Sequence, residues 1–199
     1  MQLEDGFYDV PPGKLAAVVT HLEMRAKAPL RPVPEPQGLG LERKEAPGVD
    51  WYRALFRKVG AEDWLWFSRL VMDEAALRAI LRDPLVEVYA LREGGADKGL
   101  LELDFREEGE CELAFFGLAS DLIGGGVGRW LMNRAIDLAW RRGITRFHVH
   151  TCTLDSPQAL SFYMRSGFVP VRRQVEIADD PRLAGLLPES AAPQVPILR

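Results

Sequence analysis

The sequence predicts an α+β fold, and three observations support this prediction. Three consecutive strand-like runs joined by short turns lie in the middle of the chain. A long amphipathic helical pattern follows them. A further strand, helix and strand then complete the C-terminal half. Because strands joined by short turns pair with each other, the three central runs are expected to form an antiparallel meander.

Residues 1–37 are interpreted as an N-terminal extension and a proline-rich connector outside the main domain. Apolar residues of the extension have helical spacing, but they include the β-branched run Val18-Val19-Thr20, so a helix and a strand both remain open. Four prolines between residues 29 and 36 preclude a helix there and indicate an extended connector.

The main domain is expected over residues 38–178. Its first elements are predicted from periodicity and turn residues: a strand at 39–43, helices at 51–59 and 73–82, and strands at 86–92, 98–106 and 111–119.

The best-defined helix begins at the glycine-rich turn 124–128 and ends at Gly143. A strand is predicted at 146–152, and the next helix is expected to begin with Ser156 as its N-cap and to end at Gly167. A last strand follows at 168–177, and residues 179–199, which contain four prolines, are expected to form an irregular C-terminal tail.

Composition and charge exclude several classes of partner. The net charge is −4 and no run of Lys and Arg occurs, so neither nucleic acid nor a membrane surface is an expected partner. Cys111 and Cys152 lie in apolar runs and are expected to be reduced thiols, as in a cytoplasmic protein. Glu4 and Asp5 stand where a signal peptide would be basic, and no apolar stretch approaches the roughly 20 residues that span a bilayer.

The turn Gly124-Gly125-Gly126-Val127-Gly128 has the character of an anion site. Backbone N–H groups at a helix N-terminus are unpaired and lie beside the positive end of the helix dipole, so they bind phosphate. A tight loop without a ligand is the alternative. Gly128 is followed by Arg129 rather than by Lys-Ser/Thr, which excludes a P-loop, and the three-glycine spacing of a dinucleotide fingerprint is absent.

Two motifs resemble those of the GNAT superfamily of N-acetyltransferases. Residues 123–128 are similar to its signature Gln/Arg-x-x-Gly-x-Gly/Ala, with matches at Gly126 and Gly128 and with Ile123 in place of the polar residue. Residues 156–168 are similar to Asn-x-x-Ala-x-x-Leu/Phe-Tyr-x-x-x-Gly-Phe, with Ser156 in the asparagine position. The resemblance covers roughly residues 38–177.

This resemblance implies a three-layer fold with a mixed, mainly antiparallel central sheet that is flanked by helices and splayed at the coenzyme A site. The implied cofactor is acetyl-CoA, whose pyrophosphate is held by backbone amides. The residues implied to bind it are Phe116, Leu118, Ile123, Gly124, Gly125, Gly126, Val127, Gly128, Arg129, Ser156 and Tyr163.

Three residues are candidates for catalysis by this resemblance. The Leu118 amide would bind the acetyl carbonyl oxygen. Tyr163 would be the general acid, since a phenol with a pKa near 10 can protonate a leaving thiolate with a pKa near 8.5; packing of its ring in the core is the alternative. Glu112 would deprotonate the amine, directly or through water, and alternation places it on the face of Phe116 and Leu118; a structural pair with an arginine such as Arg106 is equally open.

Two further clusters have a structural and a functional interpretation. His148, His150 and Cys152 alternate on one strand, but core packing is favoured over a metal site, and no metal is expected. The aromatic run at residues 64–67 corresponds to the variable wall of the acceptor site in the resemblance, and simple core packing is the other interpretation.

The expected function is transfer of an acetyl group from acetyl-CoA to a primary amine, by direct attack in a ternary complex without a covalent intermediate. A non-catalytic acyl-CoA-binding module and an acyltransferase that uses another acyl-CoA are the alternatives. The acceptor is expected to be a small-molecule or peptide amine, because fold and cofactor site do not determine it further. A homodimer is left open.

Overall fold

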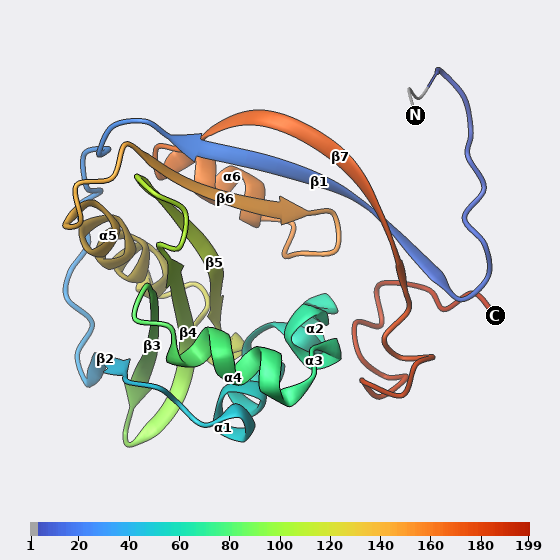
Figure 1. Ribbon diagram of the computed structural model, residues 1–199, viewed down its shortest axis with the longest axis horizontal. Coiled ribbons are helices and arrows are strands. Elements are labelled where there is room, and N and C mark those ends of the chain that lie inside the picture. Colours follow the sequence, from blue (N-terminus) through green and yellow to red (C-terminus); the bar gives the residue numbers. More distant parts are fainter. Residues whose placement is uncertain (1–3) are drawn as a thin grey trace.

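The computed structural model describes residues 4–199, which form one seven-stranded sheet with helices on both faces (Figure 1). The strand order is β2-β3-β4-β5-β6-β1-β7. The strands are β1 (Lys14–Met24), β2 (Leu39–Lys44), β3 (Val86–Glu93), β4 (Ala96–Asp104), β5 (Glu110–Leu118), β6 (Arg146–Cys152) and β7 (Val169–Asp179).

The helices are short except for α5. They are α1 (Val49–Phe56), the π-helical turn η1 (Arg57–Ala61), α2 (Glu62–Trp64), α3 (Ser68–Val71), α4 (Glu74–Arg82), the 3-10 turn η2 (Ser120–Leu122), α5 (Val127–Trp140) and α6 (Ala159–Arg165).

The sheet is mixed and mainly antiparallel, as predicted. Strands β2 to β5 form an antiparallel meander, and β5 and β6 are the parallel neighbours. Parallel pairing follows from the crossover connection through α5, which returns the chain to the same end of the sheet.

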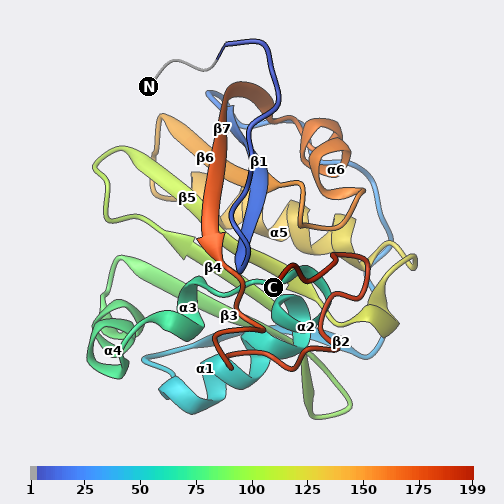
Figure 2. The ribbon, with the colours of Figure 1, turned by 90° about the vertical axis from the view of Figure 1, so that its right-hand side faces the viewer.

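The N-terminal extension is part of this sheet, which corrects the predicted boundary at residues 37 and 38. Strand β1 lies between β6 and β7 (Figure 1) and pairs antiparallel with both, and Figure 2 shows β1 and β7 side by side. Leu22 and Met24 of β1 are buried in the core. The β-branched run at residues 18–20 therefore has strand conformation, and the helical spacing of the apolar residues there has no structural counterpart.

The proline-rich connector is extended, as predicted, and it lies against α5. The side-chain amide of Asn133 donates to the carbonyl oxygen of Arg31 at 2.7 Å, and Lys27 pairs with Asp137 at 2.6 Å. Part of the polar face of α5 thus binds the connector instead of facing water.

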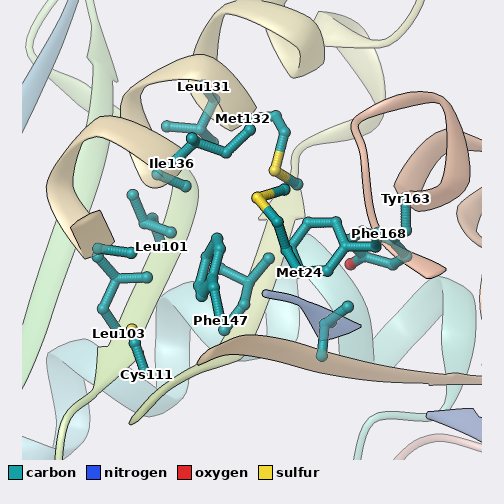
Figure 3. Close-up of a cluster of buried hydrophobic side chains, with 14 of the residues drawn as sticks. Met24, Leu101, Leu103, Cys111, Leu131, Met132, Ile136, Phe147, Tyr163 and Phe168 are labelled. Atoms are coloured by element: carbon teal, nitrogen blue, oxygen red, sulfur yellow. The ribbon is translucent and has the colours of Figure 1, made fainter. Parts of the chain in front are cut away.

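Two apolar clusters cover the two faces of the sheet. The larger cluster packs α5 and α6 onto the sheet and includes Leu101, Leu131 and Phe147 (Figure 3). The second packs α1 to α4 onto the opposite face. The C-terminal tail has no helix or strand in residues 180–199, as expected, yet it joins the second cluster through Leu187 and Ala192.

Helix α6 begins later than the sequence predicts. Gln158 occupies the N-cap position, whereas Ser156 was expected there. Ser156 and Pro157 form a preceding turn in which the Ala159 amide donates to the Ser156 carbonyl oxygen at 2.8 Å. Of the helices in the described part of the chain, none is both long enough and apolar enough to span a bilayer.

Candidate active site

The site is built around a gap between β5 and β6. The two strands pair at three positions, Glu110↔Arg146, Cys111↔Phe147 and Glu112↔His148. Beyond Glu112 both strands continue, β5 to Leu118 and β6 to Cys152, without further pairing. The sheet is therefore splayed here, as the resemblance implies, and the unpaired strand edges border an opening through it.

A β-bulge in β5 changes which residues share a face. The register with β4 shifts so that Leu103 pairs with Leu113 and Glu102 pairs with Phe115, which leaves Ala114 as the extra residue. Leu113 and Phe116 consequently both face the α5 cluster. Glu112 lies on the other face, with Phe115, so the prediction that it shares a face with Phe116 and Leu118 is wrong.

Gly117 of β5 allows a close approach of other elements to the strand. A Cβ atom on Gly117 would lie 2.8 Å from Val59 Cγ2 and 3.0 Å from Trp66 Cη2. The missing side chain therefore allows η1 and Trp66 to pack directly on β5.

The Leu118 amide is directed into the gap. The next amide, that of Ala119, donates to the Lys98 carbonyl oxygen of β4 at 2.8 Å. Because amide directions alternate along a strand, the N–H groups of Leu118 and Phe116 point away from β4, toward the open side. They are available to a ligand in the gap.

The glycine-rich turn presents a set of free backbone donors. Gly124 and Gly126 have positive φ values of 99° and 83°, a conformation that glycine adopts without strain. Hydrogen bonding of α5 begins with the Trp130 amide, which donates to Gly126. Within residues 4–199, the amides of residues 124–129 donate to no protein acceptor, so the turn fits a pyrophosphate.

A cavity of about 310 Å³ passes through the splayed sheet. Its lining includes residues from both faces. On the α5 and α6 face they are Phe116, Leu118, Ile123, Gly128, Ser156, Gln158, Ala159, Phe162 and Tyr163. On the other face they include Trp64, Leu65, Trp66, Phe67, Ser68, Phe115, His150, Cys152, Asp155 and Glu176. One continuous space thus joins the glycine-turn side to an aromatic mouth that carries carboxylates.

Tyr163 of α6 lines this cavity and is 8% exposed. Its ring packs edge-on against Phe116, with centroids 6.5 Å apart, and against Phe168 at 6.0 Å. Burial, with a smaller contribution from the charge of Asp155, raises the pKa of the phenol above its ordinary value of 10.0. The raised pKa keeps the phenol protonated at neutral pH, and among the described residues its hydroxyl has no hydrogen-bond partner, so it is free to donate.

Glu112 is paired with a histidine, not with Arg106. His150 Nδ1 lies 3.4 Å from Glu112 Oε1, while Arg106 binds Asp104 at 2.5 Å. The interaction with His150 lowers the pKa of Glu112 although burial opposes it. The same interaction raises the pKa of His150 above 6.5. His150 lines the cavity, so this pair presents an imidazole to the space.

The aromatic run at residues 64–67 forms the wall of the cavity, and it is also packed. The Trp66 ring packs in a tilted arrangement against Phe56 and Phe115, with ring centroids 5.5 Å and 5.4 Å apart. Beneath Phe115 lies a buried polar group, in which Arg69 binds Glu102 at 2.5 Å and Tyr52 donates to the same carboxylate. The run is therefore packed and also lines the cavity, while its place at an acceptor site stays a prediction.

The remaining residues that were predicted to bind the coenzyme differ in whether their side chains reach the cavity. Ile123 and Ser156 line the cavity, and Ile123 is 56% exposed. Val127 is buried in the core, so it contributes its backbone alone. The Arg129 guanidinium donates to the Pro32 carbonyl oxygen at 3.3 Å and thereby holds the connector.

Sequence reasoning did not single out Asp155 and Glu176, and it favoured core packing over a metal site for His150, whose side chain is 52% exposed. The alternation of His148, His150 and Cys152 signalled a common face, but their place beside the gap depends on where β5 and β6 separate. Across residues 4–199, no group of three or more His, Cys, Asp or Glu side chains is arranged to hold a metal ion. Both cysteines are free thiols.

Comparison with known proteins defines the class. The family model described as "Acetyltransferase (GNAT) family" matches residues 49–168, whereas no curated protein matches. This description is one of acetyltransferases, in keeping with the splayed mixed sheet. The chain belongs to the GNAT acetyltransferase family.

Solved structures share the fold at low sequence identity. A GCN5-related N-acetyltransferase from Sphaerobacter thermophilus superposes with a TM-score of 0.60 at 17% identity, over 85% of this chain and 53% of that one. A putative GNAT acetyltransferase from Novosphingobium aromaticivorans gives 0.56 at 16% identity, over 84% and 67%. An aminoglycoside acetyltransferase from an uncultured soil metagenomic sample, in complex with sisomicin, gives 0.53 at 16%, over 65% and 87%. The chain thus spans about half of the length of the Sphaerobacter protein.

Proposed function

We propose that the protein transfers an acetyl group from acetyl-CoA to a primary amine by direct attack in a ternary complex. The observation that carries this proposal is the cavity through the splayed sheet, which joins the free amides near Leu118 to an acidic, aromatic mouth. Two substrates can enter such a space from opposite faces and meet in the gap.

Position 123 is Ile123 and not a basic residue, so the backbone provides the binding surface for the coenzyme. The amides of residues 124–129 are the donors for the pyrophosphate, assisted by the positive end of the α5 dipole. Phe116 and Leu118 offer strand-edge amides in the gap. Bound acetyl-CoA would supply the activated acyl group as a thioester, and the Leu118 N–H is the donor available to polarise its carbonyl.

The amine has to lose a proton before it can attack. The Glu112–His150 pair suits this task, because His150 lines the cavity and its Nδ1 atom lies beside the Glu112 carboxylate. His150 Nε2 would accept the proton while Glu112 stabilises the resulting imidazolium. His150 is then the base, and Glu112 assists it without contacting the amine.

The leaving thiolate has to gain a proton, and Tyr163 is the group proposed to donate it. The phenol is buried at the cavity wall and has a raised pKa, so it carries its proton throughout the neutral range. A thiolate whose conjugate thiol has a pKa near 8.5 takes up a proton at neutral pH from a positioned donor, and the Tyr163 phenolate then regains its proton from solvent.

Direct attack is favoured over an acyl-cysteine intermediate. Cys152 lines the cavity, but burial raises the pKa of its thiol to about 11. Cys111 is buried in the core and the pKa of its thiol is raised further, also by burial. Since the thiolate is the nucleophilic form, neither residue is activated at neutral pH.

The aromatic mouth of the cavity, where the acceptor amine is proposed to bind, favours an amine attached to an apolar or planar group. Trp64, Trp66 and Phe67 supply flat apolar surfaces, and Asp155 and Glu176 supply negative charge for an ammonium group. Polyamines, amino acids, antibiotics and protein amines all remain within this chemistry.

The test is thiol release from acetyl-CoA over a panel of these amines, together with thermal unfolding in the presence of CoA. A bound ligand stabilises the folded state by mass action, so CoA is expected to raise Tm, and at least one amine to release thiol. A rise in Tm without thiol release for any amine would support a binding module instead. No rise in Tm at millimolar CoA would contradict the coenzyme site.

A further inference from the structure

We propose that two copies of this chain pair along the free edge of β7, as antiparallel strands related by a two-fold axis at Gln174. Such a contact is isologous, since each copy offers the same surface to the other. The inference does not depend on the proposed reaction.

Strand β7 is a long and open sheet edge. It pairs with β1 and ends the strand order, so no other strand lies on its outer side in Figure 1, and the N-terminal arm runs along the same side of the molecule in Figure 2. Ten of its 11 residues are exposed, and Val175 and Ile177 are 52% and 51% exposed. An exposed edge of this length with apolar side chains is a template for another strand.

The backbone determines which residues of β7 can bond outward. The Asp180 amide, directly after the strand, donates to the Gly13 carbonyl oxygen at the β1 side at 2.9 Å. Because directions alternate, residues 174, 176 and 178 also bond toward β1, and Arg173, Val175 and Ile177 present their N–H and C=O groups outward. A second strand can therefore pair at the odd-numbered positions.

The charges select one register among those that the backbone permits. An axis at Gln174 places Arg172 of each copy opposite the partner's Glu176, in a non-hydrogen-bonded pair where side chains lie closest. An axis at Arg172 or Arg173 would place like arginines together, and an axis at Glu176 would place glutamates together.

The two charged side chains of this register have no ion-pair partner among the described residues. Within the described chain, neither Arg172 nor Glu176 forms an ion pair. The acidic residues at the end of β7 are engaged elsewhere, since Asp179 binds Lys14 at 2.5 Å and Asp180 binds Arg182 at 2.7 Å. The Gln174 register thus forms two ion pairs between Arg172 of one copy and Glu176 of the other. It also packs Val171 of each copy against Ile177 of the other.

This pairing would bring the partner subunit to the candidate active site. Glu176 lines the cavity from β7. The partner's Arg172 would lie beside it, so the second copy would complete one side of the acceptor mouth and lower its negative charge.

The N-terminal arm supplies an independent observation at the same edge. It leaves β1 at Lys14, which pairs with Asp179 at the end of β7. Phe7 of this arm is fully exposed and Tyr8 is 57% exposed. In the proposed register the partner's Val169 comes opposite Asp179, so a second copy would place apolar surface next to the arm.

The test is the molar mass in solution, measured by light scattering and sedimentation velocity on the full chain and on charge variants. The wild type is expected to be a dimer at micromolar concentration. Arg172→Glu and Glu176→Arg should each give monomers, because each creates two like-charge pairs. The double variant should restore the dimer. Arg141→Glu, on the far side of the sheet at the end of α5, is the matched control and should stay dimeric.

A backbone variant tests the same contact without changing charge. Val175→Pro removes an outward N–H that β1 does not use, so the fold should persist, by circular dichroism, while the dimer is lost. A monomeric wild type, dimeric single charge variants, a double variant that stays monomeric, or a dimeric Val175→Pro variant would each overturn the proposal.

Discussion

Trp66 and Asp155 connect the two sides of the splayed sheet. The Trp66 indole N–H donates to Asp155 Oδ1 at 2.9 Å, while Asp155 Oδ2 accepts from the Thr151 hydroxyl and the Cys152 amide. The indole itself rests against β5, where a Cβ atom on Gly117 would meet it at 3.0 Å. One side chain thus bridges β5 and the loop after β6 at the place where backbone pairing between the strands has ended.

We predict that Trp66→Phe loosens this bridge. A hydrogen bond to a carboxylate contributes about 1.5–3 kcal/mol, so the free energy of unfolding should fall by roughly that amount. The KM for the acceptor should rise more than that for acetyl-CoA, since the residue lies on the aromatic wall. Urea denaturation and steady-state kinetics measure both effects. Trp64→Phe is the control, because Trp64 lines the same cavity and its indole has no hydrogen-bond partner among residues 4–199.

Gly126→Ala should impair coenzyme binding. Gly126 has φ of 83°, and an added Cβ would lie 3.4 Å from Val33 Cγ2, so the turn that presents the free amides is strained by about 1–2 kcal/mol. The Kd for CoA, measured by calorimetry, should rise about tenfold, whereas Ile123→Ala should change it little. Gly143→Ala provides the matched control, since Gly143 has φ of 67° at the other end of α5 with open space around it. Equal effects of both alanines on CoA binding would show that general strain, not the anion site, is responsible.

Tyr163→Phe should lower kcat by two orders of magnitude or more, the range expected for loss of a positioned acid. Binding of CoA should change by less than a factor of three, because the ring and its packing are kept. The pKa of Tyr163 is raised above 10.0, so wild-type activity should show no loss from phenol ionisation up to about pH 10. An unchanged kcat in the variant would remove Tyr163 from the mechanism.

Glu112→Gln should shift the acidic limb of the pH–rate profile. His150 accepts a proton only when neutral, so kcat/KM rises with pH through the pKa of His150. Glu112 raises that pKa above 6.5 in the wild type, and its replacement by an uncharged amide should move the limb to lower pH. His150→Gln should abolish the limb. A profile that stays in place in Glu112→Gln would rule out the pair as the base.

Much of the fold and part of the site follow from local sequence. The meander β3 to β5, the glycine turn and α5 were predicted to within about three residues, because turn glycines and apolar periodicity act within a few neighbouring residues. The glycine positions and Tyr163 came from two short motifs, whose spacing along the chain is itself local information.

Tertiary structure decided where distant segments meet. Strand β1 lies between β6 and β7 because these strands offer it partners more than 100 residues away, which periodicity within residues 14–24 does not encode. The extra residue Ala114 moved Glu112 to the opposite face from Leu118, since a bulge is defined by the partner strand β4. The sequence by itself determined the glycine turn and the chemistry of the candidate side chains. Only long-range strand pairing decided that His150, rather than Glu112, faces the cavity, because the direction of a strand side chain depends on register and on the point where the neighbouring strand departs.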